Sequence, residues 1–312
     1  MKLILALLSS TLLVTGCWGS VAPTPIENDP TTAEAASDAA RRRTADPNDV
    51  WLAFDVAASS KSEVHVMRAD GKDRRRLDLG MEASAPAFSR NGRALAFAGP
   101  NGIWVKDLPN GQLHQVTHGQ DGTPAWSPDG KHLAFTRNVD IFVVGVDGMG
   151  ERSYIHGPPP GQAWYSNYGH PVFAVDGQSL IFGHRGGIDQ GNLDGSGVHP
   201  LFVAAELDIA MATVSPDGTQ IAINSNCGVR VTPFASAAKA CDVGTKLGGG
   251  PGGISRPAWS SNGLVAYVDG WYRINLVPEA GGTPLTILDT KQSLGGAYVN
   301  EVSWSPPGTV IP

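Results

Sequence analysis

The chain has 312 residues, of which 41% are hydrophobic and 17% are charged, and this composition excludes a globally disordered protein. The formal net charge of −6 argues against a nucleic-acid-binding protein, because a polyanionic backbone needs a basic surface. The 39 glycines follow no collagen-like period, so they indicate short strands joined by many tight turns.

The first sixteen residues have the features of an export signal. Lys2 supplies a positive start, and residues 3–14 form an apolar run that is too short to span a membrane. Residues 14–17, Val-Thr-Gly-Cys, resemble the bacterial lipobox. The resemblance implies removal of residues 1–16, lipidation of Cys17 and a place in the cell envelope. An ordinary signal peptide with an incidental cysteine is the alternative. Trp18 stands where an aspartate would retain a lipoprotein at the inner membrane, so the same resemblance favours the outer membrane.

Residues 17–48 are expected to form the lipidated cysteine and a disordered tether. They are rich in Pro, Thr, Ala, Asp and Ser and have almost no large apolar side chain after Ile26. Such a segment cannot bury enough surface to offset the entropy lost on ordering. We therefore expect the folded domain to occupy residues 49–312.

From Val50 onward the chain repeats itself. The strings Pro-Ala-Phe-Ser-Arg-Asn-Gly at 86–92 and Pro-Ala-Trp-Ser-Pro-Asp-Gly at 124–130 are each followed by a second apolar run. Asp-Gly and Asn-Gly favour tight hairpin turns, because both residue types tolerate a positive φ. Positions equivalent to the aromatic residue of each string lie about 38 to 47 residues apart, the length of a propeller blade. These positions are Phe88, Trp126, Phe173, Val214, Trp259 and Trp304.

The two ends of the repeat region complement each other. Residues 51–54 match the second strand of a repeat with no first strand before it, and residues 302–304 match a first strand with nothing after it. Together they make one split blade beside five whole copies. We therefore predict an all-β fold, a six-bladed β-propeller of four-stranded antiparallel blades. Pairing of the C-terminal strand with the N-terminal blade would close the ring and remove its exposed edges.

The strongest repeats resemble a known family. The string at 124–131, Pro-Ala-Trp-Ser-Pro-Asp-Gly-Lys, and the Asp-Gly at 70–71 after an apolar strand are similar to the WD40-like (PD40) repeats of the TolB propeller. The similarity covers residues 50–312 and implies the six-bladed fold. TolB has an additional N-terminal α/β domain and is soluble in the periplasm, whereas this chain is expected to carry a lipid tether. The resemblance therefore implies the fold and says little about the role.

Two cysteines remain after Cys17. Cys227 and Cys241 form an even pair in a compartment expected to be oxidising, which favours a disulfide. Two free thiols are the alternative.

Known catalytic motifs are missing from the sequence. It has no Gly-x-Ser-x-Gly elbow, His-Glu-x-x-His pair, Walker loop or dinucleotide fingerprint. The Asp-Gly pairs at 129, 147, 194 and 217 lack the full ligand pattern of a calcium loop, so we interpret them as turns. We accordingly expect no catalytic residue, no cofactor and no metal. A metal site built from the histidines of the fourth blade is the alternative: His156, His170, His184 and His199.

Two groups of residues are candidates for binding. The residue three positions before each aromatic position is expected to lie at the entrance of the axial channel, where polar side chains would suit a polar peptide or ligand. The polar residues in or near this set are Asp121, His170, Asp208, Arg256 and Glu301. They could equally be solvated rim residues without a partner. The second group lies in a long, proline-containing insertion at 157–169: Trp164, Tyr165 and Tyr168. Aromatic loops on rigid scaffolds often bind partners.

These observations favour a non-enzymatic binding or scaffold domain. We expect a monomeric domain, held to the membrane by its lipid anchor, that docks an envelope protein or peptide at its funnel face and binds no nucleic acid. Two alternatives remain: a metal-dependent lyase or hydrolase acting on envelope polysaccharide or peptide, and a sensor of small ligands.

Overall fold

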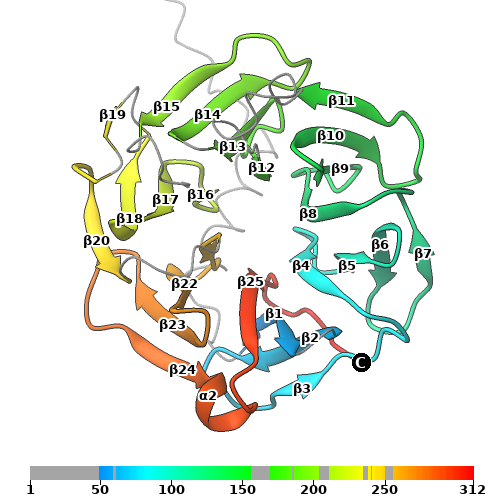
Figure 1. Cartoon of the computed structure of the whole chain (residues 1–312), viewed down its shortest axis with the longest axis vertical. Coiled ribbons are helices and arrows are strands. Elements are labelled where there is room, and N and C mark those ends of the chain that lie inside the picture. The colour runs from blue at the N-terminus through cyan, green and yellow to red at the C-terminus, as the bar shows by residue number, and fades with distance from the viewer. Residues whose placement is uncertain are drawn as a thin grey trace, which may run out of the picture. The chain divides into compact units, whose positions relative to one another are not determined.

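The computed structural model describes residues 49–58, 61–155, 169–184, 186–203, 211–234, 238–239, 241–249 and 256–312. These residues form six sheets arranged as blades around a central axis, with almost no helix (Figure 1). The predicted all-β fold of six four-stranded antiparallel blades is therefore confirmed. Blade 4 carries one additional short strand, which pairs in parallel at its outer edge.

From the axis outwards, blade 1 contains β25 (Tyr298–Trp304), β1 (Trp51–Ala58), β2 (Lys61–Arg68) and β3 (Arg75–Arg76). In the same direction, blade 2 contains β4 (Ser84–Phe88), β5 (Ala94–Gly99), β6 (Gly102–Asp107) and β7 (Leu113–Gln115). Blade 3 contains β8 (Asp121–Trp126), β9 (His132–Arg137), β10 (Asp140–Gly145) and β11 (Arg152–Ile155).

Blade 4 contains β12 (Gly169–Phe173), β13 (Ser179–His184), β14 (Gly187–Asn192), β15 (His199–Val203) and the added β19 (Ala238–Lys239). Blade 5 contains β16 (Met211–Val214), β17 (Gln220–Ser225), β18 (Gly228–Pro233) and β20 (Thr245–Gly248). Blade 6 contains β21 (Ala258–Trp259), β22 (Leu264–Asp269), β23 (Arg273–Pro278) and β24 (Leu285–Asp289), and the short helix α2 (Thr290–Ser293) leads from it to β25.

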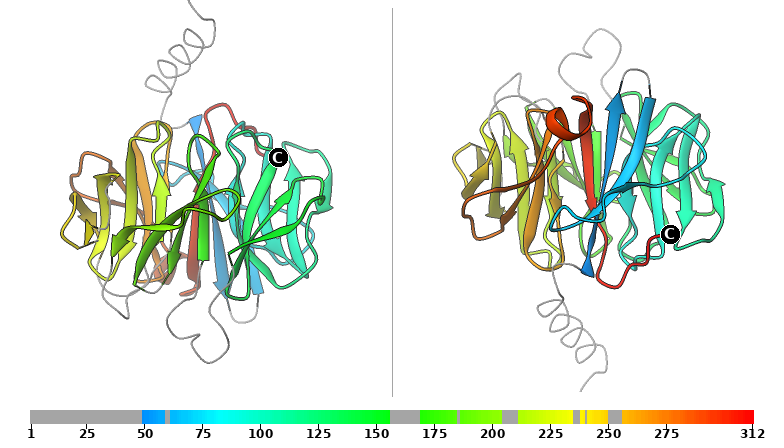
Figure 2. Two further views of the ribbon diagram at one scale, coloured as in Figure 1. Left: turned by 90° about the horizontal axis from the view of Figure 1, so that it is seen from above. Right: turned by 90° about the horizontal axis from the view of Figure 1, so that it is seen from below.

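The ring closes inside blade 1, as the two half-repeats predict. Strand β25 pairs antiparallel with β1, and Trp304 stands opposite Leu52. Beyond the strand, the Ser305 amide donates to the Trp51 carbonyl at 2.8 Å and the Trp51 amide donates to the Ser305 hydroxyl at 2.8 Å. The last and first strands of the domain thus share one sheet (Figure 2), and neither is left as an open edge at this seam.

The core lies between neighbouring blades. In blades 2, 3 and 4 the phenylalanine of the second strand shares a buried cluster with the preceding blade: Phe97 with Val66, Phe135 with Val105 and Phe182 with Val143. All three phenylalanines are fully buried. A sheet covered on both faces needs an apolar second strand without polar alternation, which explains the continuous apolar runs of the repeat.

The repeated Ser-x-Asp-Gly string makes the turn between the first and second strands. The Ser127 hydroxyl donates to Asp129 Oδ1 at 2.6 Å and accepts the His132 amide at 2.9 Å, while Gly130 has a φ of +69°. Asp129 Oδ1 also accepts the Lys131 amide at 3.0 Å, and these bonds, led by the one from Ser127, lower the pKa of Asp129. Asp147, Asp194 and Asp217 likewise accept the amide two residues onward. The carboxylates therefore act within their turns.

Cys227 and Cys241 are joined by a disulfide in blade 5, with 5.5 Å between their Cα atoms. It ties the turn between β17 and β18 to the segment that precedes β20. No helix of the described residues is long and apolar enough to cross a membrane.

Candidate functional site

An axial chamber of about 290 Å³ lies between the six innermost strands. All six repeat positions predicted from the aromatic spacing line it: Phe88, Trp126, Phe173, Val214, Trp259 and Trp304. We call the face of the ring on which the innermost strands begin the funnel face, and the face on which they end the opposite face. The mouth of the chamber at each face is the end that lies toward that face: Arg256 lines the funnel end, and Arg90 and Pro216 line the opposite end.

Three polar residues meet at the funnel face, and we call them the funnel cluster: His170, Arg256 and Glu301. His170 Nδ1 lies 3.0 Å from Glu301 Oε1, and Arg256 Nε lies 3.7 Å from Glu301 Oε2. Arg256 Nη1 donates to the Pro171 carbonyl at 3.1 Å. Glu301 belongs to blade 1 and His170 to blade 4, which face each other across a six-bladed ring. The cluster therefore spans the chamber at this mouth.

A bulge in the innermost strand places His170. The pairing of β12 with β13 shifts register between Gly169 and Val172, and His170 adopts a φ of +51°. Ala85 in β4 and Thr123 in β8 have φ values of +49° and +46° at equivalent register shifts. Bulges re-aim a side chain and tolerate the following proline, which has no amide to pair. The small Ala85 and Thr123 leave the chamber mouth free, whereas His170 reaches across it.

A second buried carboxylate supports the cluster. Asp55 Oδ1 accepts the Glu301 amide at 2.7 Å, and Asp55 Oδ2 accepts Asn300 Nδ2 at 3.1 Å. Burial, aided by the nearby charge of Glu301, raises the pKa of Asp55 to about 6. Burial alone would also raise the pKa of Glu301, but His170 and Arg256 hold it below its usual value.

The sequence interpretation missed Asp55, although the sequence contains a sign of it. Asp55 follows Phe54 in the second strand, and the residues that follow Phe97, Phe135 and Phe182 in the other blades are Ala98, Thr136 and Gly183. A charged residue at a repeat position that is otherwise small or neutral indicates a site-specific role.

A single side chain bridges the mouth on the opposite face. Arg90 follows Ser89 in the first turn of blade 2, and its Nη2 donates to the Pro216 carbonyl of blade 5 at 3.1 Å. Blades 2 and 5 also face each other across the ring. Both residues line the chamber. The axial chamber is therefore bridged at both mouths by contacts between opposite blades.

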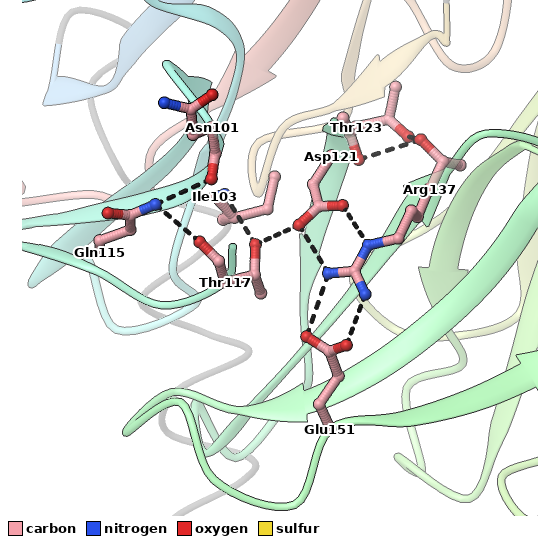
Figure 3. Close-up of polar contacts among 10 residues, drawn as sticks. Asn101, Ile103, Gln115, Thr117, Asp121, Thr123, Arg137 and Glu151 are labelled. Carbon is pink, nitrogen blue, oxygen red and sulfur yellow. Dashed lines mark hydrogen bonds and ion pairs between the residues drawn. The ribbon is translucent and has the colours of Figure 1, made fainter. Parts of the chain in front are cut away.

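Asp121 lies outside the funnel cluster, in a network between blades 2 and 3 (Figure 3). Arg137 binds Asp121 through two bonds of 2.6 and 2.9 Å, and it binds Glu151 through two more of 2.6 and 3.1 Å. Thr117 Oγ1 also donates to Asp121 Oδ2. The hydrogen bonds that Arg137 donates to Asp121 and Glu151 raise the pKa of Arg137. Since both oxygens of Asp121 are engaged, this carboxylate joins two blades.

The other predicted site residues are distributed as follows. Asp208, Trp164, Tyr165, Tyr168, His156 and Cys17 lie outside the described residues. His184 Nε2 contacts Asp189 at 3.2 Å, and His199 Nδ1 lies 2.9 Å from the Gly197 carbonyl. The described histidines of blade 4 thus have separate partners. Within the described ranges, no group of three or more His, Cys, Asp or Glu side chains could hold a metal ion.

Comparisons with known proteins concern the fold. No protein-family model matches the chain, and no curated protein sequence matches it significantly. It is similar to a chain in a crystal structure of a nidogen/laminin complex, with 12% identity, 82% of this chain and 98% of that chain covered, and a TM-score of 0.54. It is similar to oligogalacturonate lyase in complex with manganese, with 13% identity, coverage of 78% and 75%, and a TM-score of 0.51.

The chain is also similar to a putative TolB from Agrobacterium tumefaciens, with 18% identity, coverage of 82% and 90%, and a TM-score of 0.48. Identities this low establish a shared fold and nothing about activity. The fold implied by the PD40-like repeats is confirmed by the six blades and the split closure of blade 1. The chain is a six-bladed β-propeller closed within blade 1.

Proposed function

We propose that this protein is an envelope-anchored, non-enzymatic binding module that docks a segment of a protein or peptide at its funnel face. The observation that carries the proposal is the funnel cluster at the mouth of the axial chamber. The equivalent positions of blades 2, 3 and 5 hold the uncharged Ala85, Thr123 and Met211. Three of the six blades therefore have no charged residue at this level of the ring. Burying charged groups lowers stability, so folding alone does not require charge here. The charged half is better explained by recognition than by folding.

The cluster has an unmet capacity for hydrogen bonds. Glu301 Oε2 is buried and receives no hydrogen bond from the described residues, and Arg256 Nε at 3.7 Å is too distant to donate one. Buried carboxylate oxygens normally have donors. An amide or ammonium group of a docking segment would supply one after His170 moves aside. The His170 side chain is 22% exposed, so it is the member of the cluster that an incoming segment meets first.

One structural neighbour supports docking as a use of this fold. A propeller with a TM-score of 0.54 to this chain occurs in a nidogen/laminin complex. The support is an analogy of fold, and the funnel cluster itself carries the argument.

The docking proposal is tested by crosslinking in intact envelopes, with the full chain as bait. Arg256→Gln removes a charge from the cluster, and Arg74→Gln removes one from an exposed arginine of blade 1 as the matched control. A crosslinked partner that is lost with R256Q and kept with R74Q supports docking at the funnel face. A partner retained by both variants would place the binding elsewhere and refute the proposal.

The anchoring part of the proposal needs its own test. We propose that Cys17 carries the lipid and holds the domain at the envelope, on the basis of the lipobox resemblance. Metabolic labelling with a clickable fatty acid should mark the wild-type chain and leave Cys17→Ser unlabelled. Equal labelling of both chains would refute lipidation at this residue.

A metal-dependent lyase or hydrolase is the second candidate function. It is favoured by the imidazole of His170 beside the carboxylate of Glu301, whose buried Oε2 accepts no hydrogen bond from the described residues, and by the likeness in fold to a manganese-bound oligogalacturonate lyase. The described residues supply only these two groups at the funnel mouth, fewer than a manganese site normally uses. Elemental analysis of the purified protein distinguishes the two functions. Stoichiometric manganese in the wild-type chain that is absent from His170→Ala would support the metal-dependent enzyme and refute the docking proposal.

A further inference from the structure

The rim of blade 6 carries an exposed aromatic cluster, which we call the aromatic platform: Trp271, Tyr272 and Tyr298. Trp271 is 38% exposed and Tyr298 is 49% exposed. The ring centroids of Tyr272 and Tyr298 are 5.3 Å apart, and Lys291 Nζ lies 4.1 Å from the Tyr272 centroid. Trp271 is the only exposed tryptophan among the residues that the structure describes. The exposed surfaces of Trp271 and Tyr298 are available to a ligand, whereas Tyr272 is half-buried and supports them.

The backbone at Trp271 disfavours a large side chain. Trp271 lies in the turn between β22 and β23 with a φ of +68°. The equivalent turns of blades 2, 3 and 4 have Asn101, Asn138 and Gly186 at positive φ. Asn and Gly adopt this conformation readily, whereas it is strained for a bulky residue. Asparagine would fit this backbone with less strain, so the tryptophan at this position indicates a use for its side chain.

The platform is held in place by several backbone contacts. The Trp271 carbonyl accepts the Val299 amide at 2.8 Å, and the Tyr272 carbonyl accepts the Thr290 amide at 2.9 Å. Asp289 caps α2 by accepting the Lys291 amide at 3.0 Å, which fixes the start of the helix whose lysine covers Tyr272. A prefixed surface loses little entropy when it binds a ligand.

A polar hollow of about 520 Å³ lies on β23, β24 and α2, and it includes Arg273, the residue that follows Tyr272 in the chain. Its lining includes Arg273, Thr286, Asp289 and Gln292. Arg273 lies between two carboxylates, 3.3 Å from Asp269 and 3.6 Å from Asp289, so its charge is balanced locally. The Arg273 side chain is still 52% exposed. The hollow therefore offers both donors and acceptors without a strong net charge.

The geometry points to a carbohydrate-binding platform on blade 6 that takes a neutral oligosaccharide with a flat, β-1,4-linked pyranose chain. One face of such a sugar presents C–H groups, which the negative faces of aromatic rings attract. Its hydroxyl groups need donors and acceptors together, as Arg273, Asp289 and Gln292 provide. A protein partner anchored on Trp271 would instead need an apolar surround that excludes water. This platform shares no residue with the funnel cluster, although Tyr298 and Glu301 both lie on β25, and it does not depend on the docking proposal.

Calorimetric titration of the full chain with cellohexaose and with chitohexaose tests the inference. We expect at least one of the two to bind. Trp271→Asn installs the residue of the equivalent turns, so it should melt at or above the wild-type temperature and bind at least tenfold more weakly. Trp271→Phe keeps an aromatic face and should bind within about threefold of wild type. Met149→Ala is the matched control, because Met149 is 71% exposed on the opposite face.

Three results would overturn the inference. The first is that neither oligosaccharide binds the wild-type chain. The second is that W271N binds as tightly as wild type. The third is that M149A weakens binding as much as W271N does. Loss of a crosslinked envelope protein from W271N, with no sugar binding by wild type, would identify the platform as a protein-docking surface and would equally refute the carbohydrate assignment.

Discussion

Replacing Asp55 by asparagine should make the propeller more stable than wild type at neutral pH and should have little such effect in acid. Asp55 is 1% exposed, and its pKa is raised from the usual 3.8 to about 6. The folded state therefore holds this proton more tightly than the unfolded state does. Stability from this group is fully present below pH 3.8 and is lost as the pH rises through about 6. The difference between the two pKa values corresponds to about 3 kcal/mol of unfolding free energy.

Asparagine keeps the shape of Asp55 and does not titrate. Its amide oxygen can accept the Glu301 amide, which now donates to Asp55 Oδ1 at 2.7 Å. Asn300 can turn its own amide group to meet the new NH₂ group. The D55N protein should thus escape the loss that wild type suffers between pH 4 and pH 7, and the gain at pH 7.5 should approach about 3 kcal/mol.

Urea unfolding followed by tryptophan fluorescence, at pH 4.5, 6.0 and 7.5, measures the effect. Asp129→Asn is the control with the opposite sign, because the Ser127 hydroxyl lowers the pKa of Asp129. D129N should be less stable than wild type by nearly the same amount at all three pH values, because a carboxyl with a pKa below 3.8 is already ionised at pH 4.5, whereas D55N should gain stability relative to wild type as the pH rises. A difference between D55N and wild type that stays constant from pH 4.5 to 7.5 would show that Asp55 does not titrate near pH 6 in the folded protein, and the reasoning would be wrong.

Three further perturbations test the architecture. Arg137→Gln should lower the unfolding free energy by about 2 to 4 kcal/mol, because it leaves the buried Asp121 without a cation; urea unfolding measures this, and an unchanged midpoint would contradict it. Deleting residues 298–312 removes β25 and opens the edge of β1, so size-exclusion chromatography should show aggregates in place of the wild-type peak; an intact wild-type peak would disprove the closure argument. Replacing Cys227 and Cys241 by serine opens a loop with a sequence separation of 14 residues. The unfolding free energy should fall by about 3 kcal/mol, and the melting temperature should fall with it. An unchanged melting temperature under oxidising conditions would exclude a stabilising disulfide.

The six-bladed fold could be predicted from the sequence because its determinants are local and repeated. The Ser-x-Asp-Gly turn depends on contacts within a few residues, such as that of Ser127 with Asp129. The apolar second strand of each repeat needs only to be buried between the two neighbouring blades, and every repeat in the ring has such neighbours. The half-repeats at residues 51–54 and 302–304 were therefore enough to predict which strands meet, although almost the whole domain separates them.

The candidate site could be predicted only in part. The repeat placed His170, Arg256 and Glu301 at one level of the ring, and the structure brings these three together. The same argument added Asp121 as a residue near that level, two positions before Thr123, but a side chain there can turn outward. Asp121 does so because Arg137 and Thr117 bind it between the blades. Asp55 was missed because the argument followed first strands and Asp55 lies on a second strand.

The sequence by itself determined the blade length, the number of blades and the split that closes the ring, since each follows from patterns within one repeat or at its ends. Only the tertiary structure decided which side chains meet across the axis: His170 with Glu301 at the funnel face and Arg90 with the Pro216 carbonyl at the opposite face. Opposite blades are three repeats apart, so no local pattern couples them. Closure of the ring sets their distance, and the bulge that gives His170 its positive φ sets the direction of its side chain.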